Sequence, residues 1–305
     1  MKSNYAHIGL AKLCGWFGVT RQAYYQNNWN GISTTLEEDL VLRRVKEIRE
    51  NHPRMGTRKL HDLLQSFLLE HQIKMGRDAL FTMLSQNSLL VRKRKRRIQT
   101  TNSHHWYRKY PNLIRELVPT APDQLWVSDI TYWKINSGEH LYISFITDAY
   151  SHRIVGYQVA QTMEAIESIK ALQMALSTLK EVDNINLVHH SDRGIQYCSN
   201  AYVKLLQDYN IQISMTENGD PLENAIAERV NGIIKEEYLD AYSIDNIADA
   251  KELLAAVVDL YNSERPHMSI SNFTPNQVHH SKTKTERLWK NYYRKQITFV
   301  NQLQD

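Results

Sequence analysis

The chain has 305 residues, of which 42% are hydrophobic, so it is long enough for two or three domains with buried cores. No apolar run approaches the ~18 residues that a membrane-spanning helix needs, and the first residues lack a signal-peptide core. Two cysteines, Cys14 and Cys198, are too few for a disulfide framework or a zinc module, which fits a reducing cytoplasm and no membrane partner.

The net charge of +4 conceals an uneven distribution of charge along the chain. Residues 1–117 contain 21 Lys and Arg against 9 Asp and Glu, a net charge of +12. Residues 118–305 contain 16 Lys and Arg against 24 Asp and Glu, a net charge of −8. A basic first part is typical of nucleic-acid binding, whereas an acidic second part repels phosphates unless metal ions neutralise it. The combination favours an enzyme that acts on nucleic acid over a plain DNA-binding protein.

Residues 1–34 are predicted to form a small helix-turn-helix-like segment. Two short helices are expected, because Leu10 and Leu13 share a face, Gly18 breaks the pattern and Thr20 is a suitable N-cap for the second helix. The same outline occurs in DNA-binding units and in helical hairpins that pack on a partner. Both readings stay open from the sequence.

Residues 35–99 are predicted to form a helix-turn-helix DNA-binding domain with a basic arm. Thr35-Leu-Glu-Glu38 has the form of a capping box and predicts the start of a helix. Thr57 is expected to cap a second helix, a third is expected over 79–85, and a short strand over 89–91. A basic run follows, which fits phosphate contact but also a solvated linker. The candidate DNA contacts are Arg58, Arg77, Arg92, Lys93, Arg94, Lys95, Arg96 and Arg97.

Residues 100–122 are predicted to be a linker, and residues 123–281 an α/β core. Three apolar runs, the first two joined by a Ser137-Gly138 turn, predict antiparallel strands, after which helices and strands alternate. The expected strands are 124–134, 140–147, 153–160, 185–190 and 211–215, and the expected helices are 163–180, 199–209, 221–238 and 246–261.

Three carboxylates on separate elements of this core are the candidate catalytic residues. Asp192 comes at the end of a short apolar strand, where open α/β sheets bind their ligands. Asp129 lies within another strand candidate, and Glu228 lies in a helical pattern that begins after a long gap. Oxygen-rich sites of this kind suit Mg²⁺, and two such ions can hold both oxygens of a phosphoryl transfer.

The helix that carries Glu228 has a second polar face. Asp220 is the expected N-cap, with Pro221 and Glu223 completing a helix start. Glu228 shares its face with Asn224, Asn231 and Lys235, at spacings of four, three and four residues. A solvated helix face is the alternative reading, and the spacing from Asp192 weighs against it.

The sequence motifs around these carboxylates resemble those of orfB-type transposases of bacterial insertion sequences. They are His190-Ser-Asp-Arg-Gly-Ile-Gln-Tyr197, Asn224-Ala-Ile-Ala-Glu-Arg229 and Tyr261-Asn-Ser-Glu-Arg-Pro-His267, with Arg54-Met-Gly-Thr-Arg58 matching a glycine-centred word further upstream. Asp129, Asp192 and Glu228 are similar in order and spacing to the DDE triad of retroviral integrases. The resemblance covers roughly residues 40 to 280.

The resemblance implies a fold and an activity. The fold is multidomain, with a helical helix-turn-helix region, a ribonuclease-H-like integrase core and a short helical tail over 282–305. The activity is metal-dependent cleavage of DNA and transfer of a 3′-hydroxyl to a target strand, with two Mg²⁺ or Mn²⁺ ions held by the triad. Lys235 is expected to grip a phosphate, and Asn224, Asn231 and Arg193 are expected to lie at the DNA.

The resemblance also implies partners and a location. Double-stranded DNA at the element ends and at the target, a homo-oligomer of at least two chains on DNA, and a protein from an upstream reading frame are the expected partners. The expected location is the bacterial cytoplasm at the nucleoid. Two rival functions remain: a ribonuclease-H-like nuclease that cuts without joining, and a DNA-binding protein with an inactive core. The tail, which mixes basic and aromatic residues, fits either DNA contact or protein contact.

Two further polar residues have open roles in the sequence. His190 precedes Asp192 by two residues in the expected strand and either contacts substrate or packs. Asp148 ends the second expected strand, where it either supports the site or, as we favour, caps a turn with Ser151.

Overall fold

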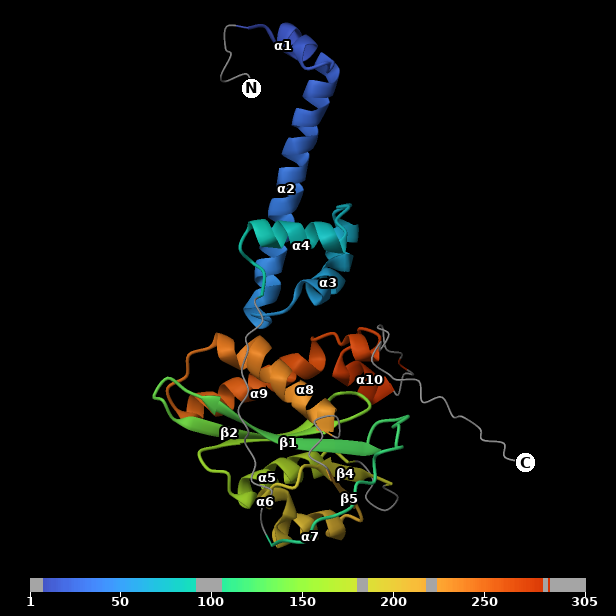
Figure 1. The fold of residues 1–305 in the computed structure, drawn as a ribbon, viewed down its shortest axis with the longest axis vertical. Helices are drawn as coiled ribbons and strands as arrows, with labels where there is room; N and C mark the ends of the chain where they lie inside the picture. The colour runs from blue at the N-terminus through green and yellow to red at the C-terminus, as the bar shows by residue number, and fades with distance from the viewer. Residues whose placement is uncertain (1–7, 92–105, 180–185, 218–223, 282–284, 286–305) are drawn as a thin grey trace, which may run out of the picture. The chain divides into compact units, whose positions relative to one another are not determined.

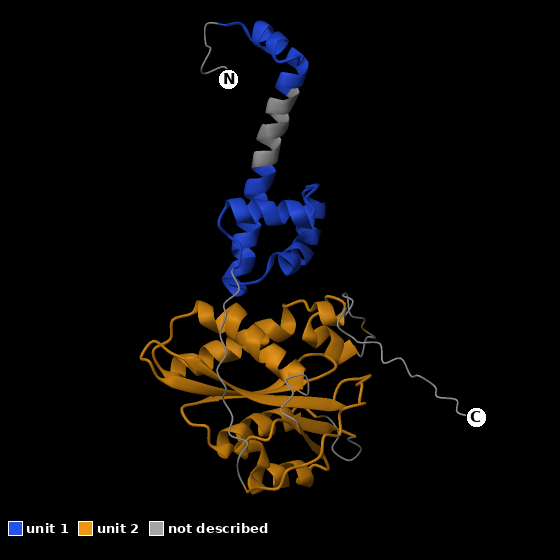
Figure 2. Ribbon diagram, in the orientation of Figure 1, with its two compact units in different colours: residues 1–93 blue, residues 94–305 orange. Residues whose placement is uncertain are grey.

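The structure is a computed structural model in which the chain forms two compact units, residues 1–93 and residues 94–305 (Figure 2). The described residues are 8–91, 106–179, 186–217, 224–281 and 285, with the backbone alone described over 26–35. The basic run Arg92–Arg97 and nearly all of the predicted tail therefore lie outside them. None of the described helices combines the length and the apolar character that crossing a membrane requires.

The first unit is helical, as the sequence predicts. Its elements are α1 (Leu10–Trp16), α2 (Arg21–Asn51), α3 (Thr57–Glu70) and α4 (Arg77–Gln86). Apolar residues of the second half of α2 pack with α3 and α4 in one core, in which Val41, Leu60 and Leu80 are fully buried. Thr20 caps α2, as predicted, by accepting a hydrogen bond of 3.0 Å from the Ala23 N–H.

The prediction that a new helix starts at Thr35 is wrong. Helix α2 runs without a break from Arg21 to Asn51 and crosses the boundary that we expected between residues 34 and 35. A threonine inside a helix costs at most about 0.7 kcal/mol relative to alanine, so a capping-box pattern alone does not interrupt a helix. Further on, Gly56 takes the cap position of α3 and Thr57 is its first residue, one position from the prediction.

The strand predicted over 89–91 does not form either. The Leu89 N–H donates to the Leu84 carbonyl at 2.8 Å, and Ser88 adopts a left-handed conformation with φ of 56°, which together end α4. The described part of the first unit has no strand with which this segment could pair. Leu89 and Leu90 instead pack against the helical core.

The second unit contains a five-stranded mixed sheet with the order β3-β2-β1-β4-β5. The strands are β1 (Leu125–Lys134), β2 (His140–Asp148), β3 (Ile154–Ala160), β4 (Val188–Ser191) and β5 (Gln212–Met215). Strand β2 is antiparallel to β1 and β3, whereas β4 is parallel to β1 and β5. All five predicted strands are confirmed, with shifts at their ends, and Gly138 makes the predicted hairpin turn with φ of 90°.

Helices cover both faces of this sheet (Figure 1). On one face lie α5 (Ala165–Leu176), α6 (Ile195–Cys198) and α7 (Asn200–Asp208), and on the other α8 (Ala225–Ile233), α9 (Ile247–Ser263) and α10 (Pro275–Ser281). Helix α5 approaches β3 so closely that a Cβ on Gly156 would lie 2.2 Å from the Ala171 carbonyl oxygen. The arrangement is the ribonuclease-H-like core that the resemblance implied.

Strand β1 lies at the centre of the sheet, and its side chains alternate between the two helical layers. Trp126 and Ile130 belong to the core formed with α5, α6 and α7. Leu125 and Val127 pack with Ala227 of α8 on the opposite face. Asp129 has the same parity as these two residues and therefore points toward α8.

The helix of Glu228 departs from the prediction of a regular α-helix over 221–238. Asp220, Pro221 and Glu223 lie outside the described residues, and α8 begins after Asn224. Beyond Ile233 the chain forms a π-helical turn, Ile234–Tyr238, and then a 3₁₀ turn, Leu239–Ala241. Side-chain periodicity cannot reveal such a turn in advance, because the turn depends on contacts made by distant residues.

The predicted linker is, from Trp106 onward, an arm that belongs to the second unit and lies against its sheet. It has no regular elements, as expected, but the Pro111 carbonyl accepts a bond from the Met215 N–H at 3.3 Å. The Leu113 N–H donates to the Ser214 hydroxyl at 2.9 Å, so the arm runs beside the edge strand β5. We call residues 106–117 the entry arm.

Candidate active site

The register between two parallel strands brings Asp129 and Asp192 together. Strands β1 and β4 pair with Ser128 opposite Ser191, and each aspartate is the next residue along its own strand. Asp192 is held in a tight turn, since its Oδ1 accepts a hydrogen bond of 3.0 Å from the Gly194 N–H. The two aspartates therefore sit side by side at the end of the β1–β4 ladder.

Helix α8 adds its polar face to this pair. The Asn231 amide donates to Asp129 Oδ2 at 2.7 Å, and the Asn224 amide donates to the Ser128 carbonyl at 2.9 Å. Glu228 lies between these two asparagines in sequence and on the same side of the helix. The shared face predicted for these residues thus lies along β1, and Glu228 is near enough to Asp129 for its charge to raise the pKa of that carboxyl.

The electrostatics of Asp129 reflect this convergence. Burial raises its pKa to about 7, and the neighbouring charges of Asp192 and, to a smaller extent, Glu228 act in the same direction. Hydrogen bonds from the Ile130 N–H (2.8 Å) and the Asn231 amide oppose the rise. Three carboxylates that repel one another form a donor set suited to a hard divalent cation, which would offset their charge.

Lys235 lies further along the same face and has a partner on β1. Its Nζ donates to the Tyr132 carbonyl at 2.5 Å and lies 3.6 Å from the centre of the Tyr132 ring. Asn224 and Asn231 are also buried, with 7% and 6% of their surface exposed. The two asparagines fix α8 on β1, and Lys235 fixes the π turn that follows α8. The predicted contact of all three with DNA stays a prediction.

A buried polar group lies on the opposite face of the same ladder. The His189 Nε2 lies 2.7 Å from the Ser128 hydroxyl and 3.0 Å from the Tyr202 hydroxyl, and burial lowers the histidine pKa to about 3. The neutral imidazole connects β1, β4 and α7 next to the aspartates. Sequence reasoning missed it, although the pair of adjacent histidines before Asp192 was the available signal.

The side chain of His190 is buried between β4 and its neighbour β5. Its surface is fully buried, and its Nδ1 lies 2.8 Å from the Ser214 hydroxyl of β5. The structure therefore favours the packing role over substrate contact. Arg193, two residues before the short helix α6, is partly exposed, and its contact with DNA remains a prediction.

The sequence motif Tyr261–His267, quoted above only for its resemblance, packs against the π turn. Arg265 is 1% exposed, and its guanidinium donates to both carboxylate oxygens of Glu237, at 2.8 and 2.9 Å. It also contacts the His267 ring at 2.8 Å. Since Glu237 lies in the turn that follows α8, this ion pair fixes the end of the helix that carries Glu228.

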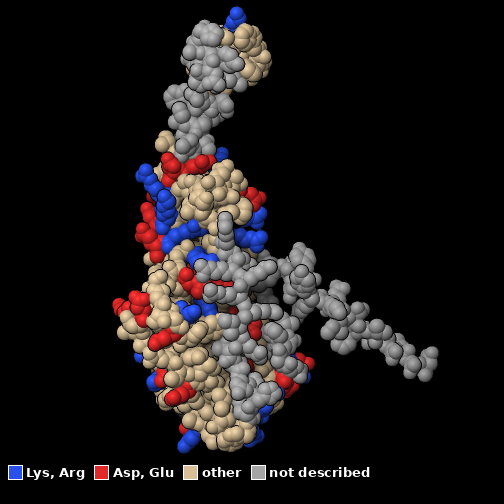
Figure 3. Space-filling model, turned by 60° about the vertical axis from the view of Figure 1, so that its left-hand side comes forward, with Lys and Arg blue, Asp and Glu red and all other residues tan. Residues whose placement is uncertain are grey.

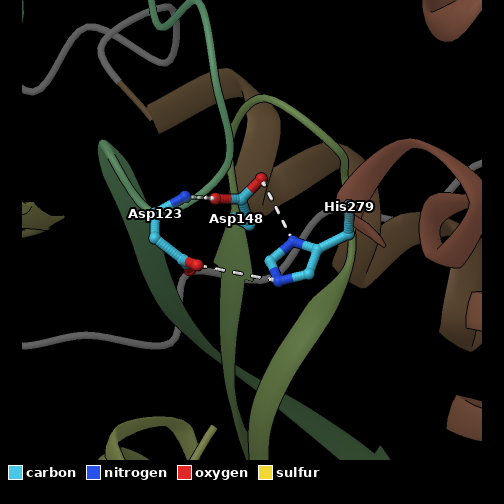
Figure 4. Close-up of side chains that lie close together, drawn as sticks. All are labelled: Asp123, Asp148 and His279. Atoms are coloured by element: carbon cyan, nitrogen blue, oxygen red, sulfur yellow. Dashed lines mark hydrogen bonds and ion pairs between the residues drawn. The ribbon is translucent and has the colours of Figure 1, made fainter. Parts of the chain in front are cut away.

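A second group of titratable side chains lies where β1 begins and β2 ends (Figure 4). The Asp148 Oδ1 accepts hydrogen bonds from the Ser151 N–H (2.7 Å) and hydroxyl (2.6 Å), which confirms the predicted turn cap. Its Oδ2 accepts from the Asp123 N–H at 2.7 Å. His279 of α10 lies 3.8 Å from Asp123 and 3.9 Å from Asp148. The three ligand atoms lie within 4.8 Å of one another, a spacing that could hold a metal ion.

Two candidate DNA contacts of the first unit are described. Arg58 and Arg77 are both exposed, in the first turns of α3 and α4, and Arg77 pairs with the adjacent Asp78 at 2.9 Å. Figure 3 shows Lys and Arg exposed on this unit, with Asp and Glu among them. The remaining candidates, Arg92–Arg97, lie outside the described residues.

Comparison with known proteins identifies the core. A family described as "Integrase core domain" matches residues 119–221, and a second family of the same description matches residues 209–275. Among solved structures, the HTLV-2 integrase catalytic core domain in complex with magnesium is similar, with a TM-score of 0.42 and 22% identity over 52% of this chain and 98% of that one.

Two relatives from Shigella sonnei match most of the chain. The "Insertion element IS600 uncharacterized 31 kDa protein" is 34% identical over 269 residues, 86% of this chain and 96% of that protein. The "Transposase for insertion sequence element IS629" is 31% identical over 266 residues, 84% of this chain and 86% of that protein. With its integrase core and full-length relatives of this kind, the chain belongs to the transposase family of bacterial insertion elements.

Proposed function

We propose that this chain is a DNA transposase that cuts the strands at the ends of its element and joins the resulting 3′-hydroxyls to target DNA. Asp129, Asp192 and Glu228 are the proposed catalytic residues. The observation that carries the proposal is the direct bond from Asn231 to Asp129, together with the β1–β4 register. These contacts support the proposal because they set the strand of Asp129 against that of Asp192 and against the helix that carries Glu228, an arrangement that a purely structural core does not require.

The three carboxylates fit a divalent cation, and we propose Mg²⁺ or Mn²⁺, with two ions per site. When bound, such ions activate a water or a DNA 3′-hydroxyl and stabilise the leaving oxygen of the phosphodiester. Asp129 and Asp192 would hold one ion, and Asp129 and Glu228 the other. Phosphoryl transfer then depends on positioning and charge neutralisation, without a covalent protein nucleophile.

The polar residues around the carboxylates position them. Asn231 holds one oxygen of Asp129, Asn224 ties the start of α8 to β1, and the Gly194 N–H fixes the orientation of Asp192. We propose that Lys235 grips a phosphate of the element end. To do so its ammonium would exchange the Tyr132 carbonyl for a phosphate oxygen while staying over the ring.

The remaining parts are proposed to bring the DNA and a second chain. The helical residues 35–99, with Arg58, Arg77 and the basic run Arg92–Arg97, would bind double-stranded DNA through phosphate contacts. Joining two element ends needs two active sites, and each chain supplies one, so we propose at least a homodimer on DNA. A protein from an upstream reading frame and a location at the nucleoid complete the proposal.

The test is a cleavage and joining assay with labelled element ends in Mg²⁺. Asp192→Asn should abolish both steps while DNA binding stays close to that of the parent protein. Asp208→Asn, which changes an exposed carboxylate of α7, is the matched control and should leave both steps intact.

Three other results would overturn the proposal in different ways. Cut product without joined product would make the protein a nuclease of the ribonuclease-H-like kind. Neither product from the parent protein, with binding intact, would make it a DNA-binding protein with an inactive core. Full joining by Asp192→Asn would refute the metal assignment.

A further inference from the structure

The entry arm begins with an exposed tryptophan that is held in place. Trp106 has 83% of its surface exposed. Its ring stacks on Tyr107, with ring centres 4.3 Å apart and planes 24° from parallel. Tyr107 in turn packs against the buried core formed with α5, α6 and α7. A large apolar ring is therefore held in place while most of its surface stays in water. Leaving that apolar surface exposed is unfavourable, which suggests that the ring has a binding partner.

The residues that follow alternate between the core and the solvent. Tyr110, like Tyr107, packs against the core, whereas Arg108 and Lys109 are exposed. The Arg108 guanidinium lies over the Tyr110 ring, 5.1 Å from its centre. Within the described part of the chain, neither cation forms a salt bridge. The exposed side of the arm thus carries one aromatic ring and two positive charges.

At Pro111 the arm reaches the ends of β4 and β5, next to the proposed catalytic residue Asp192. The Pro111 carbonyl accepts from the Met215 N–H, and Met215 pairs with Ser191, the residue before Asp192. Because β4 and β5 are parallel, both end at this edge.

We infer that Trp106, Arg108 and Lys109 form a binding site for an unpaired DNA strand beside the active site. Trp106 would stack on a base, and the two cations would contact the phosphates on either side of it. Aromatic rings with flanking cations are the standard means of binding single strands, because every base offers a flat face and every nucleotide a charge. The inference rests on the proposed function, since strand cutting is what supplies a free strand end at this edge.

Single-stranded DNA is the occupant that the chemistry favours. The three carboxylates repel phosphates, so a strand passing them needs positive charge alongside, and the exposed Arg108 and Lys109 of the arm supply it. A paired duplex hides its base faces and could not use the Trp106 ring. A protein partner would use the ring but would gain little from two adjacent cations without acidic residues of its own.

The experiment measures binding of a short oligothymidylate to the full-length protein. Salt is raised to about 0.3 M, because phosphate contacts of the basic first unit weaken with salt while stacking persists. Trp106→Leu keeps an apolar side chain without an aromatic face, and Trp106→Phe keeps the face. Leu should weaken binding roughly five- to a hundredfold, the loss expected for one unstacked base, and Phe should retain most of the affinity.

Fluorescence provides a second readout. The emission of Trp106, obtained as the difference between parent protein and Trp106→Phe, should be accessible to acrylamide in free protein and quenched by the oligonucleotide. A matched duplex should leave this emission unchanged. The double variant Arg108→Gln with Lys109→Gln should have a shallower slope of log affinity against log salt concentration. The decrease should correspond to the loss of up to about two phosphate contacts.

The outcomes separate this site from the proposed catalytic function. All binding measurements are repeated on Asp192→Asn, which needs no catalysis, so a failed transposase assignment leaves them readable. Equal affinity of parent, Leu and Phe proteins would overturn the inference. Trp106→Leu binding as tightly as Trp106→Phe would overturn it too, because an aromatic face would then not be needed. A Trp106→Leu protein that loses thermal stability without losing affinity would assign the ring to packing within the protein instead.

Discussion

Two groups of carboxylates lie along β1, and their surroundings differ. Near the start of the strand, Asp148 accepts hydrogen bonds from two backbone N–H groups and a hydroxyl. It also lies near Asp123, but His279 and Arg153 lie close by and offset the charge of this pair. Four residues into the strand, Asp129 instead faces the like charges of Asp192 and Glu228. Burial alone therefore does not identify a functional carboxylate. The charges that surround the carboxylate separate one that holds a turn from one that is poised to bind a cation.

The largest expected difference between the two groups is in catalysis. Asp129→Asn should lower joining by roughly a thousandfold or more, because a lost metal ligand removes several kcal/mol of transition-state stabilisation. Asp148→Asn should keep joining within a few-fold of the parent per folded molecule. Rates on purified protein, normalised to the folded fraction by circular dichroism, give the comparison. Similar losses in both variants would mean that the two groups act as one site.

The next effect is on stability, and here the change at Asp148 should do more damage than the change at Asp129. Asp148→Ala removes an acceptor of three hydrogen bonds inside the protein and should cost about 3 kcal/mol in the free energy of unfolding. Asp129→Asn relieves repulsion and should leave the metal-free protein as stable as the parent or more so. Denaturant unfolding without metal ions measures both. Greater damage from Asp129→Asn than from Asp148→Ala would contradict the contrast drawn here.

A further effect is a dependence of the stability on pH. The pKa of Asp129 is raised from 3.8 to about 7 in the fold, so the folded protein holds its proton over a range in which the unfolded chain has released it. The stabilisation from this proton is complete below pH 3.8 and disappears as the pH rises through about 7. Asp129→Asn should remove this part of the pH profile in metal-free protein, and saturating Mg²⁺ should suppress it in the parent. A profile that neither change alters would place Asp129 away from like charges.

Much of the second unit could be predicted from residue pattern. Apolar runs of strand length, a Ser-Gly turn and alternating helix signals gave the five strands in order, because those signals are local. The shared face of Asn224, Glu228 and Asn231 pointed to the site for the same reason, whereas the spacing of Asp192 and Glu228 did so through its resemblance to the DDE triad. The residue pattern was misleading at Thr35 and at residues 89–91. Each segment carries a local signal, for a helix start or for a strand, but no tertiary contact stabilises the structure that the signal predicts.

What the sequence determined by itself, then, is the identity of the elements and the residues that their periodic faces carry. Only the tertiary structure decided which distant groups meet. Asp123, Asp148 and His279 are far apart in the chain, as are Glu237 and Arg265, whose pairing accompanies the π turn. The contact between the entry arm and β5 also joins residues that are far apart in the chain. Contacts of this kind depend on register and on the packing of whole layers, and no short window of sequence contains that information.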